Sequence, residues 1–275
     1  MKYRHSFHAG NFADVHKHTT LLALIASLQR KDKGFLYLET HAGRGAYDLS
    51  ESPGSRASRT GLTRILAEPG ESAEIQAYGK AVRHWREVAK DRNAYPGSPL
   101  MAAGTLRDQD RAILIEQQPP EAHALERALS HHAKVRIELG DGYELLRGHL
   151  PPVERRGLVL IDPPYEESAR DFDQARTAIG AILQRFATAV IMLWYPIKDA
   201  RDTQLWRKRL RASVQQAVLV SELWVHPCDS RVALNGSGLI IIHPPYRLAE
   251  RMRIWLPQLV GMLDATGTGG CLVEE

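Results

Sequence analysis

Short apolar runs alternate with longer segments of helical periodicity along most of the chain. The first helical pattern covers residues 15–30, and Asp14 is its expected N-cap. Its apolar face carries Leu21, Leu22, Ile25 and Leu28. Seven apolar or β-branched runs of strand length follow, at residues 35–39, 111–116, 135–139, 158–161, 189–195, 218–225 and 239–242.

This alternation predicts an α/β fold with a mostly parallel, Rossmann-like sheet of seven strands covered by helices on both faces. The last two runs are joined through the glycine-containing segment 235–238, which leaves no room for a helix beside it. We therefore expect these two strands to form an antiparallel hairpin at one edge of the sheet.

Residues 49–95 interrupt the alternation. Polar and charged residues there surround a helical pattern through Ile75, Val82, Trp85 and Val88. We interpret this stretch as a small helical insertion between residues 1–48 and residues 96–275, which together form the main domain. The insertion follows the loop after the first strand, so it either helps to grip a ligand at the mouth of a site or serves as a structural lid.

Composition narrows the class of protein. The chain has 275 residues, of which 44% are hydrophobic, and its apolar runs are far shorter than the roughly 20 residues of a membrane span. Cys228 and Cys271 have no metal or redox spacing, and no signal region follows Met1, so a reducing cytoplasm is expected. The net charge of +4 suits either ordinary solubility or attraction to a polyanion. Basic residues recur at 55–61 and at 201–211, and a solvated helix face would explain the second of these clusters equally well.

Asp162-Pro163-Pro164-Tyr165 directly follows the apolar run 157–161. This places a carboxylate, a rigid turn and an expected exposed aromatic ring at the carboxyl end of a buried strand. The carboxylate of Asp162 and the carbonyl of Pro163 can each accept one N–H of a planar amine, and Tyr165 can stack on its ring. The pattern is typical of amino-group methylation, although such a turn also ends many unrelated strands.

Other candidate ligands follow neighbouring strands. Residues 39–45 include a Gly-x-Gly turn that allows close approach to the amino-acid part of S-adenosylmethionine. Glu116 can accept two ribose hydroxyls, and Asp141 can accept the adenine amine while its flanking glycines admit the ring. Ligand groups after successive parallel strands share one sheet edge, which predicts a class I S-adenosyl-L-methionine (SAM)-dependent methyltransferase.

The amino-terminal segment 3–18 is rich in reactive side chains. One hypothesis is a metal site built from His5, His8, His16 and His18, but no carboxylate–histidine spacing accompanies them, and we expect no metal. A second is that the segment crosses the carboxyl ends of the strands. In that case Asn11, Lys17 and His18 reach the cofactor, while Tyr3, Arg4 and His5 meet the substrate. The third hypothesis is that this segment is disordered.

Together, residues 3–18, 40–43, 95–99, 162–165 and 193–196 resemble the RlmJ family of bacterial 23S ribosomal RNA (adenine-N6)-methyltransferases. The resemblance spans nearly the whole chain and implies methyl transfer from S-adenosyl-L-methionine to one adenine of 23S rRNA. It implies that the cofactor site is lined by Lys17, His18, His41, Ser98, Glu116, Asp141, Gly142 and Asp162. It further implies that Asp162 is the catalytic acceptor, and that Tyr3, His5 and Lys17 serve activity or RNA binding. A monomer acting on protein-free or early precursor RNA is expected.

The chain departs from the family pattern at two places. Phe12 and His16 stand where the family has histidine and leucine, and His243 and Tyr246 flank a Pro-Pro pair usually placed between asparagine and tryptophan. These changes leave the expected catalytic positions intact. Methylation of DNA adenine, guanine N2 or protein glutamine stays an alternative, as does a protein that binds RNA without chemistry.

Overall fold

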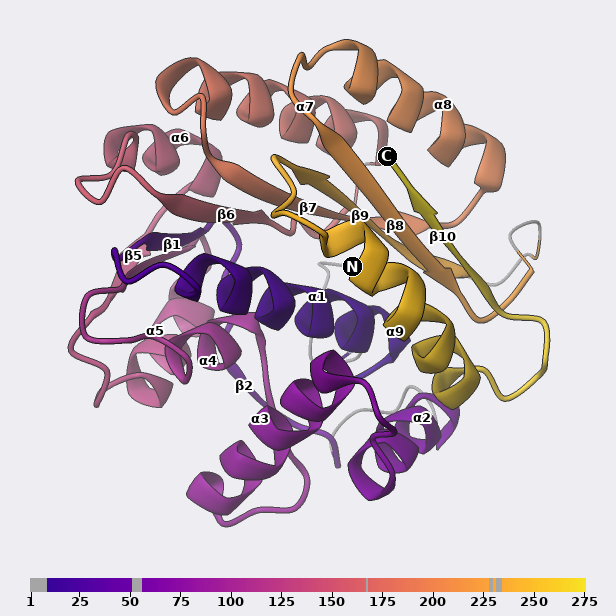
Figure 1. Ribbon diagram of the computed structural model, residues 1–275. Helices are drawn as coiled ribbons and strands as arrows, with labels where there is room; N and C mark the ends of the chain where they lie inside the picture. The colour runs from indigo at the N-terminus through magenta and orange to yellow at the C-terminus, as the bar shows by residue number, and fades with distance from the viewer. Residues whose placement is uncertain (1–8, 51–55, 167, 228–229, 231–233) are drawn as a thin grey trace.

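The computed structural model describes residues 9–50, 56–166, 168–227, 230 and 234–275. Its centre is an eight-stranded sheet with the order β10-β8-β9-β7-β6-β1-β4-β5 (Figure 1). The strands of this sheet are β1 (Leu36–Glu39), β4 (Arg111–Glu116), β5 (Val135–Leu139), β6 (Gly157–Ile161), β7 (Val190–Ile197), β8 (Val218–Trp224), β9 (Gly236–Ile242) and β10 (Gly270–Glu274).

The sheet confirms the seven predicted strands and their mostly parallel arrangement. Strands β5, β4, β1, β6 and β7 pair in parallel, and β8 and β9 form the expected antiparallel pair. The expected count was one strand too low, because β10 pairs with β8 and forms the edge in place of the hairpin. Residues of β10 are mostly half-buried and follow a Gly- and Thr-rich turn, so they carry little of the apolar signal of an inner strand.

Helices cover both faces of the sheet. In Figure 1, α7 and α8 lie on one side and α1 and α9 on the other. Alternation along β6 explains both layers, because Leu158 and Leu160 join one buried cluster while Val159 and Ile161 join the other. The helices are α1 (Phe12–Gln29), α2 (Arg56–Ala67), α3 (Ala73–Ala89), α4 (Ser98–Ala103), α5 (Pro119–Ala128), α6 (Gly142–Leu145), the 3-10 helix η2 (Leu146–His149), α7 (Ser168–Arg185), α8 (Ala200–Ala212) and α9 (Leu248–Leu263).

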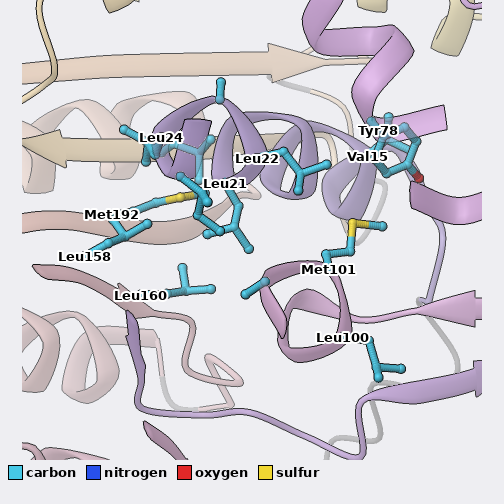
Figure 2. Packing of buried hydrophobic residues seen from close by; sticks show 14 of the residues in the cluster. Val15, Leu21, Leu22, Leu24, Tyr78, Leu100, Met101, Leu158, Leu160 and Met192 are labelled. Atoms are coloured by element: carbon cyan, nitrogen blue, oxygen red, sulfur yellow. The ribbon is translucent and has the colours of Figure 1, made fainter. Parts of the chain in front are cut away.

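Helix α1 begins earlier than the sequence predicted. Its N-cap is Asn11, whose side-chain oxygen accepts hydrogen bonds from the backbone N–H groups of Ala13 and Asp14. Asp14 is therefore in the first turn and is not the cap. The helix is buried on almost every side, and Figure 2 shows its side chains in one cluster with residues of α3, α4 and the sheet.

The 49–95 stretch contains α2 and α3. Strands β2 (Ala46–Asp48) and β3 (Ala94–Pro96) pair antiparallel and bring the two ends of this stretch together. Ile75, Tyr78 and Val82 of α3 belong to the same buried cluster as α1, so α3 is part of the main core. The division into 1–48, 49–95 and 96–275 stays a prediction. Among the described residues, no helix is long and apolar enough to cross a membrane.

Candidate active site

The candidate ligands after three strands lie together at the carboxyl ends of these strands. Glu116 ends β4, Asp141 follows β5, and Asp162 follows β6. The backbone N–H of Gly140 donates to the carbonyl of Glu116 over 3.0 Å, which ties the ends of β4 and β5 together. Because these strands are parallel, their carboxyl ends face the same side, as the sequence predicted.

Lys17 joins the amino-terminal motif to Asp162. Its ammonium lies 2.6 Å from Asp162 Oδ2 and 3.0 Å from Asp14 Oδ1, with the lysine almost fully buried. Burial alone lowers the pKa of Lys17, but the two carboxylates outweigh it and hold the pKa above its ordinary value. The described part of the amino-terminal segment therefore reaches the carboxyl end of β6, and the contact with Lys17 leaves lone pairs on Asp162 for another donor.

His18, the next residue of α1, contacts a tyrosine at the end of the 49–95 stretch. Its Nδ1 lies 2.9 Å from the hydroxyl of Tyr95, and the two rings stack with centroids 5.8 Å apart. The Tyr95 hydroxyl also lies 3.1 Å from the hydroxyl of Tyr78 on α3. The insertion is thus connected to a residue assigned to the cofactor site, through a chain of buried polar groups.

A buried carboxyl group lies at the end of β1. Glu39 is fully buried and accepts hydrogen bonds from Ser98 Oγ over 2.5 Å and from the Tyr37 hydroxyl over 2.8 Å. Burial raises the pKa of Glu39 to about 8, even though the two hydroxyl donors lower it. Ser98, which the resemblance assigns to the cofactor site, is therefore fixed by a residue that the sequence analysis did not assign.

Glu116 is anchored by backbone groups. One oxygen accepts from the N–H of Gly43 over 2.7 Å, and the other accepts from the N–H of Gln118 over 2.8 Å. Burial is the main cause that raises the pKa of Glu116. Gly43 has φ +63, and a Cβ at this position would lie 2.7 Å from the Tyr47 hydroxyl, so the Gly-x-Gly turn requires glycine here. The turn and the acid predicted to bind ribose are one hydrogen-bonded unit.

Asp141 and Gly142 have structural roles of their own. Asp141 caps α6, with Oδ1 accepting from the N–H groups of Tyr143 and Glu144. A Cβ on Gly142 would lie 1.9 Å from the carbonyl oxygen of Thr40. Close packing against the loop after β1 therefore requires glycine at this position, whatever the ligand.

His41 lies between the loops after β1 and β5. Its Nδ1 is 2.7 Å from Thr40 Oγ1, and its ring meets that of Tyr143 edge-on at 5.0 Å. Burial lowers the pKa of His41 to about 4, although Asp162 and Asp141 raise it. The imidazole is therefore neutral near pH 7 and can either donate or accept a hydrogen bond.

The expectation that Tyr165 is an exposed aromatic is wrong. Its side chain is only 2% exposed, and its hydroxyl donates to the carbonyl of Trp194 over 2.8 Å. The backbone has φ 50, in the left-handed region, and the ring packs against Phe172 and Trp194. The turn thus directs the side chain of Tyr165 into the protein, where its ring lies between Phe172 of α7 and Trp194 of β7. The role of Tyr165 toward the substrate stays a prediction.

The histidines of the amino-terminal motif have other partners. His16 is fully buried between Ser221 and Ser237, and His18 contacts Tyr95. No group of three potential ligands among His, Cys, Asp and Glu clusters within the described ranges. Tyr3, Arg4, His5 and His8 lie outside the described residues. Asn11, expected to reach the cofactor, uses its side chain as the helix cap.

The second Pro-Pro motif is at the other end of the sheet. Because β9 runs antiparallel to β7, His243 follows its end near Ala189, whose carbonyl lies 3.0 Å from His243 Nδ1. The motif therefore lies away from Asp162. In the basic segment 201–211, Arg207 and Arg211 pair with Glu222 or Glu274. The side chains of 55–60 lie outside the description.

Three residues beside the catalytic edge were not assigned from the sequence. Asp14 binds Lys17, Glu39 fixes Ser98, and Trp194 lies with its ring centroid 5.7 Å from the Lys17 ammonium. Glu39 had a usable signal, because a carboxylate at the end of an apolar strand is buried only where it has partners. Trp194 carries no such signal, because its partners Ser237 and Tyr165 are far away in the sequence. Asp14 lies one turn before Lys17, but the sequence alone assigned it as the helix cap.

Comparison with known proteins places this arrangement in a family. Residues 32–274 match the family described as ribosomal RNA large subunit methyltransferase D, RlmJ. The ribosomal RNA large subunit methyltransferase J of Escherichia coli (strain K12) is 41% identical over 100% of this chain and 98% of its own length. The protein of the same name from Haemophilus influenzae is 38% identical with the same coverage.

A solved structure has the same overall fold. The crystal structure of protein LPL1258 from Legionella pneumophila superposes with a TM-score of 0.88 at 32% identity, covering 98% of both chains. The likeness therefore covers nearly the full length of both chains. The chain therefore has the Rossmann-like fold of a SAM-dependent methyltransferase, with Glu116, Asp141 and Asp162 at the carboxyl ends of its parallel strands.

Proposed function

The chain belongs to the RlmJ family of large-subunit ribosomal RNA methyltransferases, and from this premise we propose that it methylates the exocyclic N6 amine of one adenine in 23S rRNA. The observation that carries the proposal is the position of Asp162, at the end of β6 and 2.6 Å from the ammonium of Lys17. A carboxylate held at a strand end by a buried cation is a fixed acceptor for an amine.

The adenine amine needs such an acceptor because its lone pair is delocalised into the ring. In the proposed complex, Asp162 and the carbonyl of Pro163 each accept one N–H, which orients the nitrogen lone pair toward the methyl carbon. The new N–C bond forms as the C–S bond breaks, and the amine proton passes to Asp162 or to water. Lys17 offsets the charge of Asp162 and fixes the direction of its carboxylate.

The residues around the edge fit S-adenosyl-L-methionine, which supplies the methyl group on a sulfonium and leaves as S-adenosyl-L-homocysteine. Glu116 is placed to accept hydroxyl groups, and Asp141 has a second oxygen beyond the one used for its cap. His41, Ser98 and Gly142 complete the proposed site, with Lys17 and His18 at its amino-terminal side. Neutral His41 and buried Glu39 suit a ligand that carries its own positive charge.

The RNA must present its base outside the stack. Extrusion costs a few kcal/mol for a paired base and less for an accessible one, so we propose a flipped adenine in protein-free or early precursor RNA. Tyr3 and His5 are proposed RNA contacts of the amino-terminal segment. Tyr165 is proposed to support the pocket for the adenine from inside the protein. We further propose that the protein acts as a monomer in the cytoplasm.

The test is transfer of labelled methyl from S-adenosyl-L-methionine to protein-free 23S RNA from cells that lack the gene. Nucleoside analysis of the product should show N6-methyladenosine with the wild-type protein and none with Asp162→Ala. Label at guanine N2, in DNA or in protein glutamine would keep the fold and cofactor but overturn the proposed substrate. RNA binding without any transfer would favour a binding protein.

A further inference from the structure

Trp194 lies on the strand next to the catalytic carboxylate. Strands β6 and β7 lie side by side (Figure 1). They are parallel and Ile161 is in register with Leu193, so Trp194 is level with Asp162 at the carboxyl ends of the strands. Its indole ring is also 5.7 Å from the Lys17 ammonium. Trp194 is only partly buried, whereas the following residue, Tyr195, is fully buried on the opposite face of the strand.

Of the two aromatic rings that meet beside Asp162, Trp194 is the accessible one. Tyr165 lies edge-on to the indole, with centroids 5.7 Å apart, and is almost fully covered. Its hydroxyl is bonded to the backbone carbonyl of Trp194. Tyr165 thus supports the tryptophan from inside the protein, while Trp194 is left partly exposed beside the Lys17 ammonium.

The indole is fixed by a chain of three buried polar groups. Trp194 Nε1 donates to Ser237 Oγ over 3.0 Å, Ser237 Oγ lies 3.0 Å from His16 Nδ1, and His16 Nε2 lies 2.9 Å from Ser221 Oγ. An indole N–H can only donate, so Ser237 accepts from it and has its own hydrogen for His16 Nδ1. If Ser237 donates to His16 Nδ1, the imidazole carries its hydrogen on Nε2 and donates to Ser221.

These hydrogen bonds hold Trp194 in a way that packing alone does not. A tryptophan held only by packing could rotate about its side-chain bonds, whereas a bonded Nε1 fixes the plane of the ring. His16 stands where the family pattern has leucine, and all of its hydrogen-bonding capacity is used on Ser221 and on the serine that holds the indole.

We propose that Trp194 forms the stacking wall of the target-adenine site, and that Ser237 and His16 are positioning residues that hold its indole in place. The proposal rests on the proposed function, because it names the residue that receives the flipped purine. Stacking on an aromatic face suits any base, so Trp194 supplies affinity and alignment while Asp162 and Pro163 select the amino group. The ion pair of Lys17 and Asp162 then lies beside the edge of the stacked base.

The test compares single-turnover methyl transfer to protein-free 23S RNA at saturating S-adenosyl-L-methionine. Trp194→Phe keeps a ring that stacks but loses the bond to Ser237, so it should fall severalfold, as Ser237→Ala does, whereas Trp194→Leu should lose about 10- to 100-fold in kcat/KM. Trp85→Phe, in the partly buried face of α3, is the matched control and should equal wild type. Ser237→Ala and His16→Leu should lower the maximal rate severalfold while affinity for S-adenosyl-L-homocysteine is unchanged.

A second measurement does not depend on turnover. Adenosine added to the protein with S-adenosyl-L-homocysteine should quench tryptophan emission in wild type and in Trp85→Phe, and the quenching should be absent in Trp194→Phe. Ser237→Ala should shift the emission component that Trp194→Phe removes. Equal quenching in wild type and Trp194→Phe, or equal rates for Trp194→Leu and wild type, would overturn the role of Trp194 alone. No methylation of RNA adenine by the wild-type protein would overturn the proposed function and this inference together.

Discussion

The ammonium of Lys17 bridges Asp162, which follows β6, and Asp14, one turn earlier on α1, at 2.6 and 3.0 Å. One buried cation is therefore shared between the carboxylate proposed to hold the substrate and a carboxylate that belongs to the amino-terminal motif. Asp14 also accepts from the backbone N–H of Gly10 over 2.9 Å, which fixes its own orientation. The catalytic edge is completed by a helix that is far from it in sequence.

Asp162→Asn should reduce methyl transfer by roughly 10²–10³-fold, the usual cost of losing one preorganised electrostatic contact to a reacting group. The amide keeps the volume but loses the charge that Lys17 and the amine recognise. Single-turnover rates with RNA measure the effect, and calorimetry with S-adenosyl-L-homocysteine should show that cofactor binding persists. Asp173→Asn, an exposed carboxylate on α7, is the control. A fully active Asp162→Asn would contradict the assignment.

Lys17→Met should abolish detectable turnover and destabilise the protein by about 3–5 kcal/mol, because buried Asp14 and partly buried Asp162 lose their counter-ion. Asp14→Asn should be milder, near tenfold in rate, since Lys17 keeps its closer partner Asp162. Thermal unfolding and single-turnover rates separate the two effects. If Asp14→Asn proved as inactive as Lys17→Met with normal stability, Asp14 would have a direct part in the chemistry.

Much of this edge could be predicted from the sequence, and the limits have physical causes. The apolar runs located β4, β5 and β6, so Glu116, Asp141 and Asp162 were correctly placed after parallel strands. Local patterns cannot report contacts such as that between Lys17 and Asp162, which are 145 residues apart. The burial of Tyr165 was missed for a related reason, because a turn sequence does not reveal which way a left-handed backbone directs a ring.

Glu39→Gln should remove a pH dependence of stability. Burial raises the pKa of Glu39 to about 8, against a usual value of 4.5, so the folded state holds a proton that the unfolded state has lost. Its contribution is fully present below pH 4.5 and is lost as the pH rises through 8. Wild type should lose on the order of 4 kcal/mol from this group between pH 5 and 8.

Urea unfolding at several pH values measures this difference. The Glu39→Gln curve should be flatter than wild type over that interval, and the exposed control Glu126→Gln should follow wild type. Parallel curves for Glu39→Gln and wild type would show that the carboxyl group titrates normally in the folded protein.

His16→Leu should change how the stability of the protein depends on pH under acidic conditions. Burial lowers the pKa of His16 to about 3, so the unfolded chain takes up a proton near pH 6.5 that the folded protein refuses. The stability that this group contributes is present above 6.5 and is lost as the pH falls toward 3. Between pH 6.5 and 5, wild type should lose about 2 kcal/mol that His16→Leu does not lose.

At pH 7 wild type should be the more stable of the two proteins. His16→Leu leaves the hydroxyls of Ser221 and Ser237 without the imidazole, which should lower the free energy of unfolding by about 1–3 kcal/mol. The stabilities of the two proteins should therefore converge as the pH falls. An unchanged difference between them from pH 7 to 5 would mean that His16 is protonated in the folded state.

Gly142→Ala should disrupt the cofactor side of the site through packing alone. The added methyl group would meet the Thr40 carbonyl at 1.9 Å, so the loops after β1 and β5 must separate, at a cost of several kcal/mol or a displaced α6. Gly148→Ala is a matched control in the adjacent turn, because no atom lies within 4 Å of its added methyl. Thermal unfolding and S-adenosyl-L-homocysteine affinity should both fall for Gly142→Ala and stay at wild-type values for Gly148→Ala. Normal stability with lost affinity would instead mean that Gly142 is required by the ligand and not by Thr40.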